Sequence, residues 1–100
     1  MNPPPDYREV KALQAKLRNA RGGMTDVQVL DLSAAGCMVD ARGTGLRVDD
    51  RILVKMEGLE FMPGYVLWIE EDRAGIAFER VMHETIYEHL KLRLPQAKAA

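Results

Sequence analysis

The chain has 100 residues, of which 47% are apolar and 29% charged, and its 14 lysines and arginines nearly balance its 15 aspartates and glutamates. This length suits one compact domain with a core of its own, and the composition excludes disorder over most of the chain. A net charge of −1 provides no general attraction to phosphate, so we do not expect a nucleic acid polymer as partner.

Cysteine content and the absence of targeting signals bear on the compartment. The single cysteine, Cys37, excludes an internal disulfide and a multi-cysteine metal site. Residues 1–7 lack the basic and apolar stretches of a signal peptide, and no apolar run approaches the roughly 20 residues of a membrane helix. We therefore expect a cytoplasmic protein without membrane insertion.

The two ends of the chain differ in composition from its middle. Residues 1–7 contain three consecutive prolines and almost no apolar side chains, which predicts a flexible leader. Residues 95–100 begin with a proline that ends a predicted helix, so they are expected to form a tail. Because no repeat or low-complexity tract interrupts residues 8–94, we expect them to form one domain.

The first half of that domain predicts a hairpin and a turn. A strand is expected around residues 10–18, and Arg21-Gly22-Gly23 is typical of a hairpin turn before a second strand. Residues 27–32 are apolar on both parities, a pattern typical of a strand buried on both faces. Ala34-Ala35-Gly36 then predicts a tight turn into a third strand at residues 37–39.

Three further strands are expected in the second half. Residues 52–56 alternate apolar and polar side chains, and Tyr65, Leu67 and Ile69 form another alternating set. The acidic run Glu70-Glu71-Asp72 is expected to be a solvated turn before a last strand at residues 76–78. Six short strands at intervals of roughly 8–12 residues predict an antiparallel barrel or sandwich.

The chain ends in a different pattern. Between residues 81 and 92, apolar side chains recur every three or four residues, which predicts an amphipathic helix that plugs or flanks the barrel. The apolar stripe consists of Met82, Ile86, Tyr87, Leu90 and Leu94.

The segment Asp31-Leu32-Ser33-Ala34-Ala35-Gly36 combines polar side chains and a glycine where a strand ends. The Asp31 carboxylate can accept two N–H bonds from the edge of a guanine, and Ser33 can donate to a phosphate oxygen. Gly36 permits a positive φ, which lets backbone N–H groups approach an anion. The alternative is a plain tight turn, in which Asp31 and Ser33 bond to local backbone.

Three features join this turn in one pattern: Arg8 before the first strand, Trp68 late in a strand, and Ala74-Gly75-Ile76-Ala77-Phe78 before the helix. Over residues 8–92 the chain resembles the PilZ domain, a bacterial receptor module for cyclic di-GMP. The resemblance implies a six-stranded antiparallel β-barrel of the split-barrel type with a C-terminal α-helix. It also implies two ligand motifs, an Arg-x-x-x-Arg before the first strand and an [Asp/Asn]-x-Ser-x-x-Gly turn after the second.

This chain matches the two motifs unequally. The turn motif is complete, whereas in the arginine motif Arg8 takes the second position and Pro4 stands where the first arginine belongs. In the family both arginines clamp the nucleotide through their guanidinium forks. The resemblance therefore implies that cyclic di-GMP is bound by Arg8, Asp31, Ser33 and Gly36, with Lys11 and Arg18 as auxiliary cations.

Other reactive side chains do not form a catalytic or metal site. His83 and His89 are six residues apart on the predicted helix and point in different directions, so they cannot share a metal ion. Cys37 is expected to be a small buried apolar residue. Residues 43–45 lack the strand–turn–helix setting of a dinucleotide site. We expect no enzymatic activity, metal or cofactor.

The leading hypothesis is second-messenger signalling. Cyclic di-GMP binding is expected to order the N-terminal leader, and the altered surface to contact an unidentified protein effector. The alternative is a degenerate PilZ domain that has lost the nucleotide and acts as a protein–protein interaction adaptor.

Overall fold

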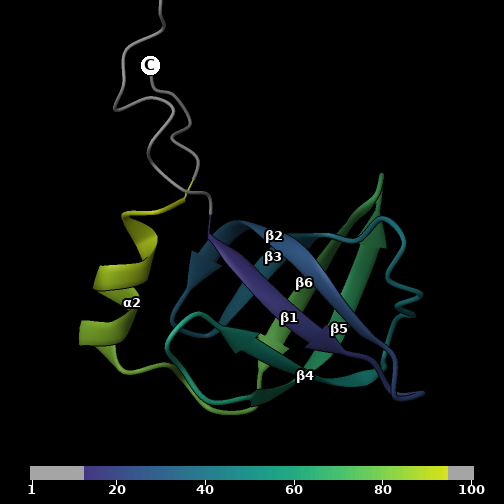
Figure 1. Cartoon of the computed structure of the whole chain (residues 1–100), viewed down its shortest axis with the longest axis horizontal. Helices are drawn as coiled ribbons and strands as arrows, with labels where there is room; N and C mark the ends of the chain where they lie inside the picture. Colours follow the sequence, from purple (N-terminus) through teal and green to yellow (C-terminus); the bar gives the residue numbers. More distant parts are fainter. Residues whose placement is uncertain (1–12, 95–100) are drawn as a thin grey trace, which may run out of the picture.

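The computed structural model describes residues 13–94, which form six strands and one helix (Figure 1). The predicted leader, the predicted tail, Arg8 and Lys11 lie outside the described residues. The elements are β1 (Gln14–Arg18), β2 (Met24–Ser33), β3 (Gly36–Asp40), β4 (Arg51–Met56), β5 (Met62–Glu70), β6 (Arg73–Phe78) and α2 (Glu84–Lys91).

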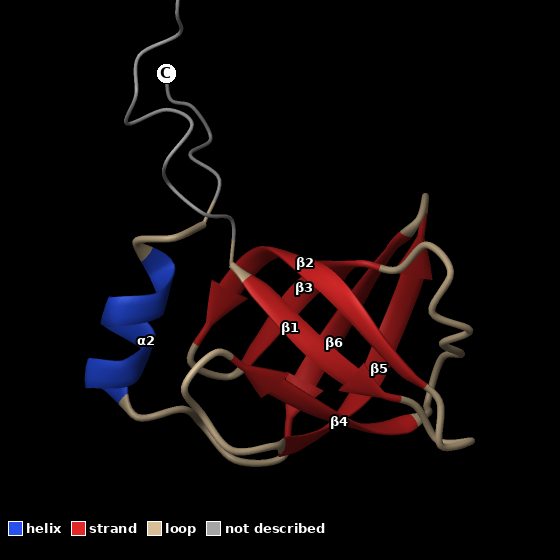
Figure 2. Ribbon diagram, viewed as in Figure 1, coloured by secondary structure: helices blue, strands red, loops and turns tan. Residues whose placement is uncertain are grey.

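The six strands close into an antiparallel barrel in the order β1-β2-β3-β6-β5-β4, which confirms the barrel and excludes the sandwich (Figure 2). Alternate side chains point into the barrel, as the period of a strand requires. In β4, for example, Ile52, Val54 and Met56 are buried, as their alternation predicts. The largest fully buried side chains are Leu13, Leu17, Val29, Val39, Ile52, Val54, Met56 and Val66.

The apolar run in β2 has a different origin from the one predicted. Val27 and Val29 are buried, but the pairing of β2 with β3 shifts between Val29 and Asp31, and the next buried side chain is Leu32. A β-bulge therefore exchanges the inward and outward parities at Leu30. The strand buries one face throughout, so the prediction of a strand buried on both faces was wrong.

A second bulge changes β5. Its pairing with β6 shifts between Val66 and Trp68, so Leu67 is the extra residue. The predicted alternation of Tyr65, Leu67 and Ile69 on one face was wrong for this reason. Val66 is the last fully buried side chain of the strand, and the large side chains after it are exposed.

The helix α2 lies beside one end of the barrel and does not enter it (Figure 1). Leu90 is buried against the core, and Tyr87 packs partly on it, but Ile86 stays largely exposed although it belongs to the predicted apolar stripe. His83 precedes the helix as its N-cap, with Nδ1 accepting the Thr85 N–H at 3.1 Å. The helix is therefore shorter than predicted, and the two histidines do not share it.

Within residues 13–94, no helix has the length and apolar content needed to cross a membrane.

Candidate ligand-binding site

The bulge in β2 determines which way the motif side chains point. Asp31 has the same parity as Val27 and Val29, whose side chains fill the core, so a regular strand would bury its carboxylate. The bulge between Val29 and Asp31 turns Asp31 and Ser33 outward and places Leu32 in the core. Bulges that redirect side chains recur next to functional sites, so the polar pair stands on a strand held by the barrel.

Both motif side chains bond to nearby backbone. One oxygen of Asp31, Oδ1, accepts the Leu32 N–H at 2.9 Å. The Ser33 hydroxyl accepts the Ala35 N–H at 3.2 Å and donates weakly to the Gly36 carbonyl at 3.4 Å. The structure thus contains the local bonds of the plain-turn alternative. Asp31 Oδ2 makes no hydrogen bond within the described chain and faces solvent, so the carboxylate keeps acceptor capacity.

The turn between β2 and β3 is fastened through its carbonyl groups. The Ala34 carbonyl accepts the Met82 N–H at 2.7 Å, and the Ala35 carbonyl accepts the Phe78 N–H at 2.8 Å. These bonds tie the turn to the end of β6 and to the segment that leads into α2. Because its backbone is held from outside, the turn presents Ser33 from a rigid position.

Gly36 serves a different purpose from the one predicted. Its φ is not positive, whereas four other glycines in the described chain do adopt positive φ values. A Cβ at position 36 would overlap the carbonyl oxygen of Ile76 on β6. The glycine therefore permits the close approach of β3 to β6, which closes the barrel beside the turn.

The auxiliary cations are not gathered at this turn. Arg18 pairs with Met24, at the opposite end of β2 from Asp31. Seven residues of strand separate Met24 from Asp31, which amounts to roughly 20 Å along β2. Arg18 therefore cannot contact a ligand group held by Asp31. Arg8 and Lys11 lie outside the described residues.

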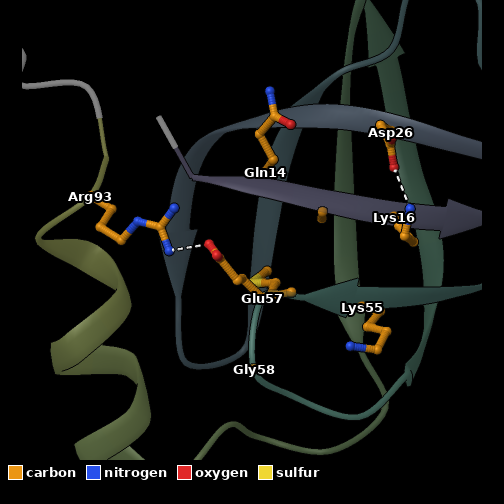
Figure 3. A pocket seen from close by; sticks show the side chains of 9 residues that line it. Gln14, Lys16, Asp26, Lys55, Glu57, Gly58 and Arg93 are labelled. Carbon is orange, nitrogen blue, oxygen red and sulfur yellow. Dashed lines mark hydrogen bonds and ion pairs between the residues drawn. The ribbon is translucent and has the colours of Figure 1, made fainter. Parts of the chain in front are cut away.

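An open cleft of about 580 Å³ crosses the outer faces of β1 and β4 and reaches Arg93, shortly after the end of α2 (Figure 3). Its floor continues the outer face of β2, because Gln14 pairs with Gln28 and Lys16 with Asp26. Gln28 precedes Asp31 by three residues, so this end of the cleft lies roughly 10 Å from the motif. The lining residues are Gln14, Ala15, Lys16, Asp26, Lys55, Met56, Glu57, Gly58 and Arg93.

The cleft contains three cations and two carboxylates. Lys16 Nζ pairs with Asp26 Oδ1 at 3.1 Å, and Arg93 Nη1 pairs with Glu57 Oε1 at 2.6 Å (Figure 3). Lys55 makes no ion pair with any residue in the range 13–94. Lys16 is exposed, whereas Lys55 and Arg93 are partly exposed. Because ion pairs in contact with water are weak, an anionic ligand can compete for these cations.

Sequence reasoning missed this cationic group. Lys16 alternates with the buried Ala15 and Leu17 in β1, so its outward direction was readable from the period of the strand. Lys55 and Arg93 join it only because β4 pairs with β1 and because the Leu13 N–H donates to the Arg93 carbonyl. Those contacts are not local in the sequence, so no pattern near Lys16 indicates them.

Groups with catalytic potential are inert or scattered. Burial raises the pKa of the Cys37 thiol to about 12, which keeps it protonated and confirms the expectation of a buried apolar residue. Among the residues the structure describes, no three histidine, cysteine or carboxylate side chains are placed to hold a metal ion. Residues 43–45 form a loop, as expected, and Thr44 is buried within it.

Comparison with known proteins agrees with this architecture. A family model described as PilZ domain matches residues 7–94 and so covers the whole described part of the chain. The family consists of receptors for cyclic di-GMP and is not a catalytic one. None of the curated proteins matches the chain.

Proposed function

This chain belongs to the PilZ domain family, and from that premise we propose that it is a receptor for cyclic di-GMP and binds the nucleotide at Asp31 and Ser33. The proposal rests on one observation above all. The bulge in β2 turns both side chains out of the core, where the parity of the strand would otherwise bury the carboxylate.

The guanine end of the ligand suits the Asp31 carboxylate. Guanine carries two adjacent N–H donors on one edge, and a carboxylate with a free oxygen can accept from both after releasing the Leu32 N–H. The Ser33 hydroxyl lies two residues further along the same outer face and can turn toward a phosphate oxygen. The pair therefore offers one contact to the base and one to the backbone of the ligand.

The phosphate end suits the cations around the cleft. Lys16 is exposed and Lys55 is partly exposed, and both stand on the face that the motif shares. Arg8 precedes Leu13 by five residues, so a covalent reach of at most about 17 Å joins it to the point where the Leu13 carbonyl accepts the Val29 N–H. This reach allows Arg8 to approach a ligand held at the motif.

We propose that the bound state is read by a protein effector through direct contact. Ligand held between the motif and the segment that contains Arg8 would order that segment and alter the surface next to α2. An effector that contacts this surface would then distinguish the bound chain from the free one.

A second function has its own support. Pro4 occupies the position of the missing arginine, and Asp31 and Ser33 already bond to local backbone. Both observations favour an adaptor that binds a protein constitutively and no longer binds the nucleotide. One charge-assisted contact contributes about 1.5–3 kcal/mol, so losing the arginine alone weakens binding roughly 10- to 150-fold.

Calorimetric titration separates the two functions. Cyclic di-GMP is titrated into the full chain, with GTP as the nucleotide control. The receptor predicts heat of binding for cyclic di-GMP that Asp31→Ala reduces at least about tenfold, because the base loses its acceptor. The matched control is Glu60→Ala, which removes an exposed carboxylate from the β4–β5 loop and should leave binding unchanged.

Circular dichroism and urea unfolding accompany the titration. If Asp31→Ala unfolds, the residue anchors the turn, and Asp31→Asn tests the ligand contact, since the family motif accepts either residue. No binding by the folded wild-type chain would favour the adaptor. Pro4→Arg then restores the arginine spacing with Arg8. A gain of about tenfold or more in affinity for cyclic di-GMP would show that the missing arginine at position 4 had weakened binding.

A further inference from the structure

The second half of β5 has a neighbouring strand on one side only. Asp49 and Asp50 together face Val66, since the Asp49 N–H donates to the Val66 carbonyl at 2.8 Å and the Val66 N–H donates to the Asp50 carbonyl at 3.0 Å. Asp49 has a φ of 74°, and β4 begins at Arg51, so the pairing of β4 with β5 ends at Tyr65. Beyond Val66, β5 pairs with β6 alone (Figure 1).

We call the segment Leu67–Glu70 of β5 the open edge. In an antiparallel strand, successive residues direct their N–H and C=O groups to opposite neighbours. The open edge has a neighbour on one side only, so part of its backbone groups face no strand of the described chain. Free groups of this kind are a template for another strand.

Large apolar side chains surround the open edge. The bulge makes Leu67 the extra residue, and it is 57% exposed, while Trp68 and Ile69 are each 39% exposed. Tyr65, two residues earlier, is 43% exposed. Natural sheet edges are usually protected by lysine, proline, inward-pointing charge or a bulge. Residues 65–69 contain none of the first three, and the bulge at Leu67 leaves Trp68, Ile69 and Glu70 in regular pairing with β6. Free backbone groups and apolar side chains thus occur at the same place.

Charge indicates the kind of segment that fits. Carboxylates outnumber cations at one end of the open edge, the exposed turn of Glu70, Glu71 and Asp72 beside Arg73. At the other end Asp50 is ion-paired with Arg21, and Asp49 is balanced by the nearby Arg47. An occupant with basic residues at the end beside the acidic turn is therefore favoured over a neutral or acidic one.

The same charges disfavour a second copy of the chain. If two open edges paired antiparallel, Glu70 of one copy would lie opposite Leu67 of the other. Its acidic turn would then extend toward Asp49 and Asp50 of the other copy, which Arg47 and Arg21 balance, and symmetry would repeat this contact. A second copy therefore offers the acidic turn no excess of positive charge, whereas a basic segment supplies it.

We propose that the open edge binds an extended segment of another protein, which adds a strand to β5. The segment has apolar side chains at alternate positions, to cover Leu67 and Trp68, and lysine or arginine at the end that lies beside the acidic turn. This binding lies at the other end of β3 from the Asp31 motif and goes beyond the proposed nucleotide function, on which it does not depend.

Selection from a library of short random peptides tests the proposal with a probe that does not require the natural partner. The immobilised full chain is the target, with no nucleotide present, and Leu67→Lys is the counter-target, since it places a protecting charge on the open edge. Val81→Lys is the matched control, because Val81 is 73% exposed and lies between β6 and α2, away from any strand edge. Trp68 is the only tryptophan, so its emission reports binding directly.

The proposal predicts enriched peptides with alternating apolar residues and a basic end. They should shift Trp68 emission to shorter wavelength, slow amide hydrogen exchange at residues 67–70 in the wild type, and bind Leu67→Lys at least tenfold more weakly than Val81→Lys. It is overturned if no peptide is enriched, if enriched peptides show helical spacing or acidic ends, or if they leave exchange at residues 67–70 unchanged. Sedimentation that shows a dimer broken by Leu67→Lys would assign the open edge to a second copy and also overturn it.

Discussion

The two ends of β3 lie in regions of the barrel built in opposite ways. At its start, the β2–β3 turn is fastened by the Met82 and Phe78 amides, which donate to the Ala34 and Ala35 carbonyls. At its end, the β5–β6 hairpin extends from the barrel with one side of β5 free beyond Val66. The first region presents polar side chains on a rigid support, and the second presents apolar side chains on an unpaired strand.

One device, the β-bulge, produces both outcomes. The bulge in β2 turns the carboxylate of Asp31 outward, and the bulge in β5 turns Trp68 outward, although Trp68 has the parity of the buried Val66. What differs is the side chain that the bulge exposes and the pairing of the strand around it. A bulge by itself therefore predicts exposure, and its neighbours decide which ligand the exposed group suits.

The largest expected effect comes from filling the contact behind the turn. Gly36→Ala places a Cβ against the Ile76 carbonyl oxygen, and backbone cannot move aside cheaply. We expect a loss of about 3 kcal/mol or more in the free energy of unfolding, measured with urea. Gly58→Ala is the control, because Gly58 has a positive φ but no atom lies close to an added Cβ. The expected loss in the free energy of unfolding is about 1 kcal/mol. Equal losses for the two variants would contradict the rigid turn.

A smaller effect is expected at the hairpin end. Gly75→Ala places a Cβ against the Trp68 indole, which is a side chain and can swing outward because nothing in the described chain covers the open edge. We expect about 1–3 kcal/mol of destabilisation. The accompanying shift of Trp68 emission to longer wavelength would show that the indole, and not the backbone, has moved. An unchanged spectrum would contradict this picture of a yielding edge.

The pH dependence of stability tests whether solvent reaches the core beside the turn. The pKa of Cys37 is raised to about 12 in the folded chain from 9.0, so its contribution is fully present below pH 9 and is lost as the pH rises toward 12. Between pH 8 and 10 this loss is about 1 kcal/mol. Urea unfolding of the wild type and of Cys37→Ala at both pH values isolates this loss, because the two proteins share all other titrating groups. If the free energy of unfolding changes equally with pH in both proteins, solvent reaches the thiol in the folded chain.

The smallest effect concerns the helix beside the motif. His83→Ala removes the acceptor for the Thr85 N–H and should cost about 1 kcal/mol. His83→Asn restores an N-cap acceptor and should recover that loss. Thermal unfolding followed by circular dichroism measures both, and a failure of asparagine to recover stability would show that His83 acts through packing.

Local patterns were enough to predict the strands and the exposed acidic turn, and the resemblance to the PilZ domain selected the barrel over the sandwich. Alternation in β4 identified Ile52, Val54 and Met56 as core, since no bulge interrupts that strand. The same reasoning failed in β2 and β5, because a bulge depends on pairing with a neighbouring strand and leaves little mark on the period.

The candidate site was predictable in part for a related reason. Asp31 and Ser33 form a short motif, and an inward parity for a carboxylate is a sign of a bulge that could have been used. The need for glycine at position 36 arises from Ile76, forty residues away in the chain. Lys55 and Arg93 reach the cleft through the pairing of Lys55 with Lys16 and the contact of Arg93 with Leu13, which are also far apart in the sequence.

The most direct test of the nucleotide site is a map of amide chemical shifts during titration of the full chain with cyclic di-GMP. We predict large changes at Leu32–Gly36 and in β1 around Lys16, with the open edge at Leu67–Glu70 unchanged. Saturating cyclic di-GMP that leaves Leu32–Gly36 unmoved, or moves the open edge instead, would contradict the claim that Asp31 and Ser33 form the nucleotide site.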